Sequence, residues 1–393
     1  MMNIAYILNN TSESNGDTKA FLNMLNDIIA KGVRPFIITP NKEGIYHLLE
    51  SNDKIRIKAL NYRPCAYPRL RITIDYLYFI PKLLARLFVN HKATRQLAAC
   101  LKENSIDIVH TNVGVVRIGF DAAQKNGIPH IYHIREYADK ININYFPTKN
   151  SFIRQLNSNK SYSICITKAV QTYYQQSGKK ISRVIYDGVF SKKTTLPISF
   201  SKNYFLFAGR IQPAKGLDQL LKAYSLYSMS EANPLHLKIA GGYTDSTYYR
   251  QLFKFVEENH LTELVEFLGN RNDILELMRE ARSLIVSSAF EGFGFCMPEA
   301  MQQGCLVIGR NTSGTKEQLD NALEMTGQEI ALRYETTEQL ASLLSEVANQ
   351  PVSHYNALTQ RAFDVVNQLY TKEDHVRNVY EYYIDILNEK ELS

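Results

Sequence analysis

The sequence is poor in cysteine and has no long hydrophobic run, and both shortages exclude classes of protein. Its five cysteines show no CxxC or Cys/His ligand spacing and are Cys65, Cys100, Cys165, Cys296 and Cys305. A small, odd set of this kind predicts reduced, mostly buried thiols, which are typical of a cytoplasmic protein. No apolar stretch approaches the roughly 18 residues that span a bilayer. The first residues, MMNIAYILNN, lack a basic start and a small-residue cleavage site, so we interpret them as a buried strand rather than a signal peptide.

Several motifs are also missing. The chain contains no D-x-D, and no group of His, Asp or Glu has ligand spacing, so we expect neither a metal nor a resident cofactor. No G-x-G-x-x-G follows the first strand, which argues against a dinucleotide-dependent dehydrogenase. Repeats and low-complexity segments are absent too, so we expect an ordinary folded protein.

The length and the apolar pattern predict two domains of the α/β class. The 393 residues exceed what one hydrophobic core usually holds. Short β-branched runs alternate with helical patterns in both halves, which is typical of parallel sheets covered by helices on both faces. We predict a first Rossmann-like domain over 1–190, a linker over 191–202 and a second Rossmann-like domain over 203–372. An amphipathic helix is expected over 373–393, and two such domains imply a cleft between them.

Positive charge gathers in the first half. Residues 1–190 carry 26 Lys and Arg against 13 Asp and Glu, and the stretch 54–102 contains eleven cations with Asp75 as its one acid. One interpretation is a helix that packs on the first sheet and exposes a solvated basic face. The other is a surface over residues 63–102 that docks on an anionic membrane through a basic face, whose cations are Arg69, Arg71, Lys82, Arg86, Lys92 and Arg95. We do not expect a nucleic-acid partner, because no recognised binding motif accompanies the charge.

In the second half, the loops that follow two expected strands contain residues suited to a diphosphate sugar. Gly209 and Arg210 follow the run YFLFA, and Lys215 comes five residues after Arg210 at the start of a helical pattern. Two cations at a strand-to-helix turn can neutralise a pyrophosphate, although such a fragment alone also fits a solvated surface turn.

A second loop follows the run SLIVSS and reads AFEGFGFCMPEAMQQG. Gly294 lets a ligand approach the backbone closely, and a helix is expected to start near Met297. Glu299 lies one turn inside this helix, where its carboxylate can accept hydrogen bonds from both hydroxyls of a ribose. Glu291 precedes the loop and can hold the hydroxyls of a second sugar ring.

The segment 291–304, EGFGFCMPEAMQQG, resembles the E-x7-E motif of the family-4, GT-B-fold retaining glycosyltransferases. FAGRIQPAKGLDQLL resembles the phosphate-binding turn of the same family, and IAGG, FLGNRNDILELM and SGTKEQL fall where the family has its other sheet-edge loops. The first half matches more weakly, through NIAYILNN, DIVHTN, YHIREY, CITKAV and VIYDGV in the family's order. The resemblance implies a GT-B fold whose last helix packs back on the first domain.

The resemblance also assigns roles to single residues. It implies a catalytic group of Arg210, Lys215, Glu291 and His133, in which the two cations bind the diphosphate. It implies donor binding by Glu299 at the ribose and by the backbone or loops at Gly16, Gly209, Gly241, Gly294, Phe295 and Cys296. His133 equally fits a buried structural histidine. The first loop has one glycine, Gly16, where the family has a pair, and HIRE replaces the commoner His-Asp.

The expected function is therefore a hexosyltransferase that moves a sugar from a nucleotide diphosphate sugar, as co-substrate, with retained configuration. The sequence resembles bacterial capsule and exopolysaccharide enzymes. This resemblance implies a glycan or lipid-linked acceptor in cell-surface polysaccharide synthesis. We expect the protein in the cytoplasm, with the inner face of the plasma membrane as a peripheral site. Two alternatives stay open: a GT-B nucleotide-sugar epimerase, and a two-domain protein that binds a small ligand without catalysis.

Overall fold

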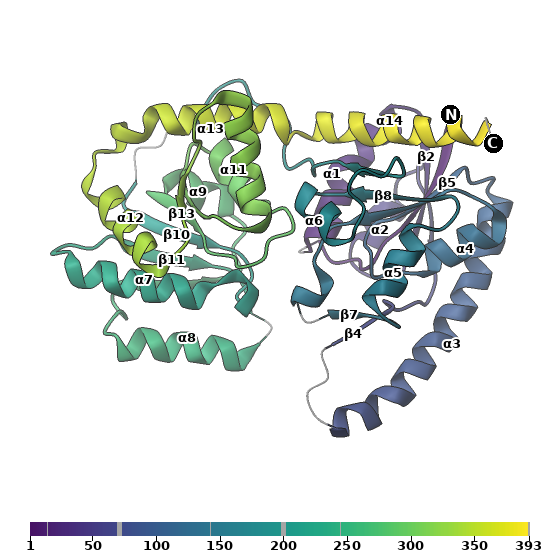
Figure 1. The fold of residues 1–393 in the computed structure, drawn as a ribbon, viewed down its shortest axis with the longest axis horizontal. Helices are drawn as coiled ribbons and strands as arrows, with labels where there is room; N and C mark the ends of the chain where they lie inside the picture. The colour runs from purple at the N-terminus through teal and green to yellow at the C-terminus, as the bar shows by residue number, and fades with distance from the viewer. Residues whose placement is uncertain (14, 69–72, 142, 198–201, 244, 392–393) are drawn as a thin grey trace. The chain divides into compact units, whose positions relative to one another are not determined.

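The computed structural model describes residues 1–13, 15–68, 73–141, 143–197, 202–243 and 245–391 (Figure 1). The chain forms two compact units, which are residues 1–188 together with 372–393, and residues 189–371. Each unit is built around one parallel sheet with helices on both faces, so the predicted α/β class with two doubly wound domains is confirmed. Within the described residues, no helix is long and apolar enough to cross a membrane.

The sheet of the first unit has seven strands, all paired in parallel, in the order β3-β2-β1-β5-β6-β8-β9. They are β1 (Met2–Ile7), β2 (Val33–Thr39), β3 (Arg56–Ala59), β5 (Ile108–Thr111), β6 (His130–Ile134), β8 (Ser161–Cys165) and β9 (Ser182–Val184). Strands β5 and β6 are buried at every position, as the central strands of a sheet covered on both faces must be. A small antiparallel pair, β4 (Ala66–Pro68) and β7 (Ile143–Tyr145), lies outside this sheet.

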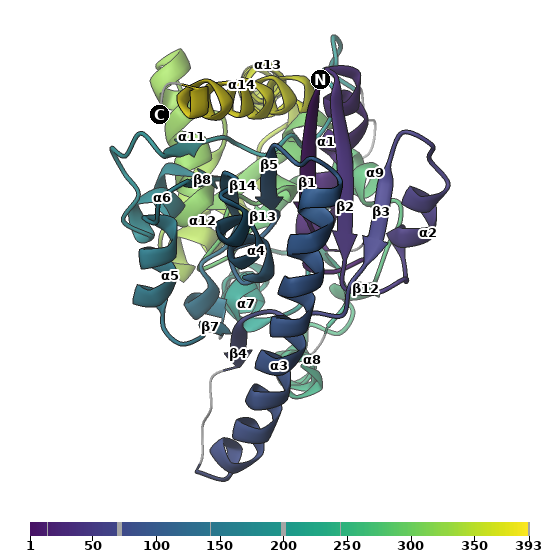
Figure 2. The ribbon, with the colours of Figure 1, turned by 90° about the vertical axis from the view of Figure 1, so that its right-hand side faces the viewer.

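Two groups of helices cover this sheet (Figure 2). The helices of this unit are α1 (Gly16–Ala30), α2 (Ile45–Glu50), α3 (Thr73–Glu103), α4 (Ile118–Asn126), η1 (Ala138–Ile141), α5 (Lys149–Leu156), α6 (Lys168–Tyr173) and α14 (Lys372–Glu391). Helices α1, α2 and α14 share one apolar core with the sheet, while α3 packs along α4, which contacts β5 and β6. Threonines cap two of the short helices, because the Thr148 and Thr167 side chains accept backbone N–H groups of the first turn.

The C-terminal helix α14 is an integral part of the first unit. Val376, Val379, Tyr383 and Ile386 are buried in the same core as Phe21 of α1 and the residues of β1. The last helix therefore packs on the first unit, although residues 185–371 separate it from β9 along the chain.

The second unit has a six-stranded parallel sheet in the order β12-β11-β10-β13-β14-β15. Its strands are β10 (Tyr204–Ala208), β11 (His236–Ala240), β12 (Val265–Gly269), β13 (Ser283–Val286), β14 (Leu306–Arg310) and β15 (Leu332–Tyr334). Its helices are η2 (Pro213–Lys215), α7 (Leu217–Ser230), α8 (Ser246–Glu258), α9 (Ile274–Glu280), α10 (Cys296–Gln302), α11 (Ser313–Thr326), α12 (Thr337–Asn349), η3 (Val352–Tyr355) and α13 (Asn356–Leu369). Helices α7, α8 and α12 form the main apolar core with this sheet, and α10 packs against α9 and α13.

The described part of the segment expected as a linker belongs to the second unit. The Gln302 side chain donates to the Ser191 carbonyl at 3.0 Å, and the Lys193 amide donates to Asn367 at 2.8 Å. At its other end, Lys202 donates to the Arg279 carbonyl at 2.6 Å. The chain instead passes between the units at 188–189 and at 371–372, so a polar, proline-containing composition did not mark the boundary.

Candidate active site

The chemistry-bearing loops of the second unit meet at the carboxyl edge of its sheet. Strand β10 lies between β11 and β13, so the chain leaves β10 in one direction and later returns on its other side. Loops at such a reversal of strand order diverge and leave room for a ligand. The turn after β10 and the loop after β13 are in contact there, since the Ala289 amide donates to the Ala214 carbonyl at 3.0 Å.

Lys215 and Glu291 form an ion pair where these two loops meet. Lys215 Nζ lies 2.6 Å from Glu291 Oε2, and the Ser288 hydroxyl donates to the same oxygen at 3.0 Å. Burial opposes the charge on Lys215, but the Glu291 carboxylate outweighs it and raises the pKa of Lys215 above its usual value. The lysine therefore stays protonated at neutral pH, and Arg210, which follows β10, is exposed at the same edge.

Glycines bring the backbone close to this pair. Gly294 has φ +89, and a Cβ there would lie 2.7 Å from Glu291 Cγ. Gly241, after β11, approaches the turn at Gly209 so closely that a Cβ would lie 1.9 Å from the Gly209 carbonyl oxygen. A side chain at position 241 would push the two loops apart, and one at position 294 would displace the Glu291 side chain, so the sequence needs glycine at both positions.

The helix after the glycine loop presents the second acid of the motif. Helix α10 begins at Cys296, one residue before the expected start, and Phe295 is its N-cap residue. Glu299 lies in the first turn and is half-buried. Burial, followed by the charge of Glu291, raises the pKa of the Cys296 thiol to about 12, so this cysteine is a packed neutral group and not a nucleophile.

Sequence reasoning missed two side chains that shape this loop. The buried Gln318 of α11 donates through Nε2 to the carbonyl of Phe293, and to that of Gly294 at 3.4 Å. The Ser287 hydroxyl donates to the Lys215 carbonyl at 2.8 Å and so ties the two loops together. Gln318 lies in SGTKEQL and Ser287 in SLIVSS, but no pattern in either segment predicts that a side chain folds back onto a neighbouring loop.

A cavity of about 220 Å³ opens at the ends of β11 and β12. It is lined by Ile211, Gly241, Gly242, Tyr243, Tyr249, Phe267, Gly269 and Asn270. The Tyr243 ring stacks on Tyr249 with a centroid distance of 4.2 Å, and half of the Tyr243 surface is exposed. An exposed aromatic face beside the Asn270 amide suits a planar, polar ring.

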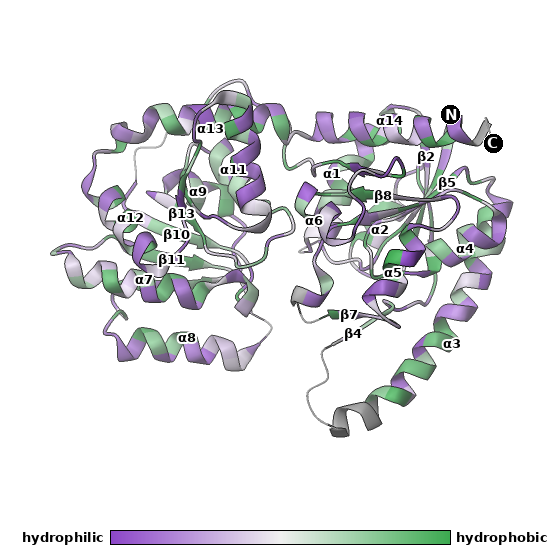
Figure 3. Cartoon of the chain, in the orientation of Figure 1, coloured by the Kyte–Doolittle hydropathy of each residue, from purple (hydrophilic) through white to green (hydrophobic). Residues whose placement is uncertain are grey.

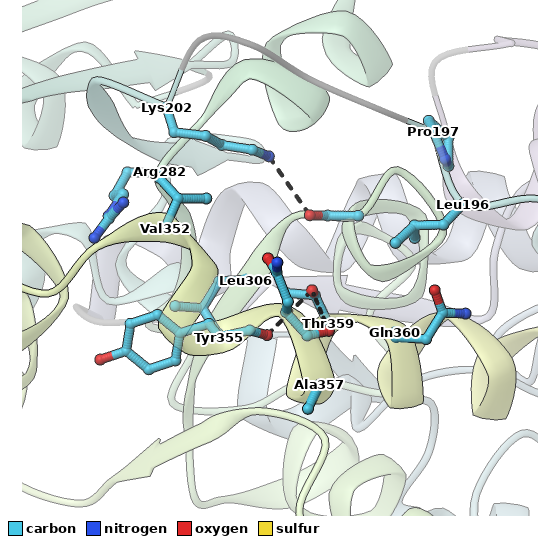
Figure 4. A pocket seen from close by; sticks show the side chains of 12 residues that line it. Leu196, Pro197, Lys202, Arg282, Leu306, Val352, Tyr355, Ala357, Thr359 and Gln360 are labelled. Carbon is cyan, nitrogen blue, oxygen red and sulfur yellow. Dashed lines mark hydrogen bonds between the residues drawn. The ribbon is translucent and has the colours of Figure 1, made fainter.

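A second cavity, of about 540 Å³, lies at the opposite end of the same sheet (Figure 4). Lys202, Arg282 and Leu306 of its lining stand at or next to the amino ends of β10, β13 and β14. Its two cations already bind backbone carbonyls, Lys202 at Arg279 and Arg282 at Val347. The cavity therefore lies far along the strands from the ion pair and belongs to another part of the unit.

In the first unit, His133 is a fully buried member of a histidine cluster. Its ring stacks between His110 and His375, and its Nδ1 lies 3.2 Å from Nε2 of His110. Burial, with the charge of Arg135 next, holds the pKa of His133 well below its usual range. No part of its surface is exposed, because the side chain points from β6 into the core that α14 closes. The structural interpretation left open by the sequence therefore fits His133 better than the catalytic one.

Arg135 and Asp187 form a buried ion pair directly beside His133. The Arg135 Nε donates to the Asn112 carbonyl at 3.2 Å, so the arginine ties the ends of β5 and β6 to the segment before the unit boundary. Arg135 belongs to the HIRE sequence, and its contacts with Asp187 and Asn112 explain how this buried cation is accommodated.

Glu136, the last residue of HIRE, was not singled out from the sequence. It follows β6 at the carboxyl edge of the first sheet, and burial, with the charge of Asp17 next, raises its pKa to about 7. Asp17 lies in the first turn of α1 next to Gly16, which is exposed and has no neighbour within 4 Å of a would-be Cβ.

The second unit is similar to a known protein family. Residues 191–364 match the family described as glycosyl transferases group 1. An uncharacterized glycosyltransferase of Methanocaldococcus jannaschii is 27% identical over 55% of this chain, and the O-antigen chain mannosyltransferase B of Escherichia coli is 30% identical over 31% of it. The alignments span 59% and 32% of those two relatives.

The fold of the whole chain also has a solved counterpart. The Anabaena protein HepE, solved in complex with UDP and glucose, superposes with a TM-score of 0.74 at 17% identity. The match covers 98% of this chain and 100% of that one. The likeness at this low identity concerns the fold, and it confirms the GT-B class predicted from the sequence.

Proposed function

We propose that this chain, whose residues 191–364 match the glycosyl transferases group 1, transfers a sugar from a nucleotide diphosphate sugar with retained configuration. The observation that carries the proposal is the Lys215–Glu291 ion pair, held at 2.6 Å between two glycine-containing loops at the switch point of the sheet. A cation suited to a diphosphate and an acceptor suited to sugar hydroxyls thus lie side by side.

Each group at this edge has a role in the proposed reaction. Arg210 and Lys215 bind the diphosphate, while Glu299 accepts hydrogen bonds from the ribose. Glu291 exchanges its contact with Lys215 for the hydroxyls of the transferred sugar when the donor binds. The backbone at Gly294, Phe295 and Cys296 lines the same space, and the Gly209 and Gly241 turns border it.

The proposed chemistry needs no protein nucleophile. The bond between the anomeric carbon and the diphosphate oxygen breaks, and the acceptor oxygen bonds to the same face of that carbon. The acceptor proton moves to the departing diphosphate. Negative charge grows on that leaving group, so Arg210 and Lys215 stabilise the transition state more than the bound donor.

The nucleobase is proposed to bind in the cavity beside Tyr243 and Asn270. The exposed Tyr243 face supports this placement, because stacking on an aromatic ring suits any planar base. Uridine diphosphate sugars are the first donors to test, since the fold is shared with a protein solved with UDP and glucose.

We further propose that transfer is independent of divalent metal. The support is the pair of cations, Arg210 and Lys215, at the turn where the diphosphate is expected. Activity should survive EDTA. A rate that falls on chelation and returns with Mn²⁺ or Mg²⁺ would contradict this part of the proposal.

The acceptor is proposed to be a glycan or a lipid-linked sugar in cell-surface polysaccharide synthesis. The protein is proposed to lie in the cytoplasm. The name of the E. coli relative, an O-antigen chain mannosyltransferase, supports the acceptor class. All five cysteines are free, which supports a reducing compartment.

One experiment separates transfer from the two alternatives. The purified chain is incubated with a panel of nucleotide sugars and a membrane extract, and both the nucleotide released and the sugar products are analysed. Nucleoside diphosphate release together with a new glycoside supports the proposal. An isomerised nucleotide sugar, or nucleotide release with only an isomerised free sugar, would indicate an epimerase, and tight binding without turnover would indicate a binding protein.

A further inference from the structure

We propose that α3 docks the first unit on an anionic lipid surface. The exposed apolar residues of its first half enter the bilayer, and the exposed basic residues of its second half meet the headgroups. This inference extends the proposed function, because it names the surface where a lipid-linked acceptor is met. Docking itself requires no catalytic activity, so the two proposals fail independently.

The first half of α3 exposes a continuous apolar stripe. Ile80, Leu84, Leu87 and Phe88 recur at helical spacing, so they lie on one face of the helix. Leu84 is 62% exposed and Phe88 is 73% exposed, which is unusual for side chains of this size. Figures 1 and 2 show this half of α3 extending beyond the sheet of the first unit, and Figure 3 shows its hydrophobic colouring.

The second half of the same helix packs one face on the unit and exposes basic residues on the other face. Ala93, Thr94 and Leu97 are buried, and α3 packs along α4 over this part. The stripe that carries the apolar residues continues here as His91, Arg95 and Lys102, and Lys92 stands next to it; all four are exposed. The second half of α3 is thus packed on the unit, while the apolar stripe of its first half is exposed.

The charges on α3 favour a lipid surface over another protein chain. Among residues 79–103 the one acid is Glu103 at the end of the helix, so the basic zone has no acidic counterpart. Parallel pairing with a second copy would bring like charges together, and antiparallel pairing would set basic side chains against the apolar stripe. Anionic headgroups above a hydrocarbon layer match both zones in their observed order.

Among the cations expected to carry such contacts, Lys92 and Arg95 are exposed on or next to the apolar stripe. Arg69 and Arg71 lie outside the described residues. The Arg86 guanidinium donates to the carbonyl of Ala66, and to that of Pro64 at 3.4 Å, so it holds β4 against the helix. Lys82 is exposed, but by helical spacing it lies away from the apolar stripe.

Co-sedimentation of the full chain with vesicles tests the proposal, using phosphatidylcholine with and without phosphatidylglycerol. Binding is expected with the anionic vesicles alone and should weaken as salt is added. Leu84→Ser with Phe88→Ser should abolish it. Lys92→Glu, Arg95→Glu and Lys102→Glu together should lower vesicle affinity roughly a hundredfold, at about fivefold for each cation.

The matched control is the triple variant Arg34→Glu, Lys54→Glu and Lys180→Glu, which changes the net charge equally at exposed sites of the first unit outside α3. It should keep most of the vesicle binding. Equal losses in both triple variants would reduce the effect to overall charge and overturn the proposal, as would no binding at low salt. A dimer in solution that the serine variant makes monomeric would assign the stripe to a second copy. Circular dichroism of each variant confirms that it is folded.

Discussion

At the scale of single residues, Glu291 is held by hydrogen bonds to both its carboxylate and its backbone carbonyl. It accepts hydrogen bonds from Lys215 and Ser288, and its own carbonyl accepts from the Gly314 amide at 3.0 Å. The loop is thus fixed on one side by the backbone, while the carboxylate stays at the sheet edge. A residue held in this way can exchange one partner for a ligand without a change in the loop.

Glu291→Gln and Glu299→Ala are expected to lower catalytic efficiency roughly a hundredfold each, since a charge-assisted contact is worth about 2–3 kcal/mol. Initial rates at low donor concentration measure this loss. Glu257→Ala, at an exposed position of α8, is the control and should leave the rate unchanged. Wild-type rates in either site variant would remove that residue from the proposed donor site.

The carboxyl of Glu136 predicts a pH dependence of stability. Burial and Asp17 raise its pKa from 4.5 to about 7 in the folded protein. The folded state therefore keeps a proton that the unfolded chain has released, and this contribution to stability is lost as pH rises through about 5 to 7. Glu136→Gln should remove that loss, so the variant gains about 1–3 kcal/mol over wild type between about pH 5 and pH 8.

Urea unfolding at several pH values measures this difference. Asp53→Asn, an equally conservative change at an exposed position, serves as the control and should run parallel to wild type. If the free energies of unfolding of Glu136→Gln and wild type differed by the same amount at all pH values, the pKa of Glu136 would not be raised in the folded protein.

At the scale of elements, α14 completes the core of the first unit. Val379 of this helix has no exposed surface and packs among residues of α1 and β1. Val379→Asp should destabilise the first unit by at least about 3 kcal/mol, because it buries an unpaired charge. Asn378→Asp adds the same charge one residue earlier on the exposed face and should change little, as urea unfolding will show. Similar midpoints for the two variants would mean that α14 is not needed for that core.

The order of elements was predictable from the sequence, since buried parallel strands appear as short apolar runs such as NIAYIL and YFLFA. The loops after β10 and β13 were predictable too, because glycine and charge directly follow such runs. The boundary between units was not, since Ser191 and Lys193 are polar yet bind the second unit through hydrogen bonds. The roles of His133 and Gln318 also depend on which face of an element meets which neighbour, and local sequence does not encode this.

At the scale of the whole molecule, the charge is divided between the two halves. The first half is basic and carries the exposed cations of α3, whereas residues 191–393 have an excess of acids over bases. Arg210 and Lys215, the two cations proposed to bind the donor, therefore lie within an otherwise acidic unit, which favours local rather than general attraction of an anion. This division agrees with a donor that binds one unit and an anionic acceptor surface that meets the other.

The central claim, that the sheet edge of the second unit binds a nucleotide diphosphate sugar, is tested most directly by calorimetric titration of UDP and UDP-glucose. Wild type and Lys222→Met, an exposed lysine of α7, should bind alike. Lys215→Met should bind roughly a hundredfold more weakly, the equivalent of about 2–3 kcal/mol for a lost ionic contact. Equal affinity in Lys215→Met and Lys222→Met, or no binding of any nucleoside diphosphate across a panel of bases, would contradict the account.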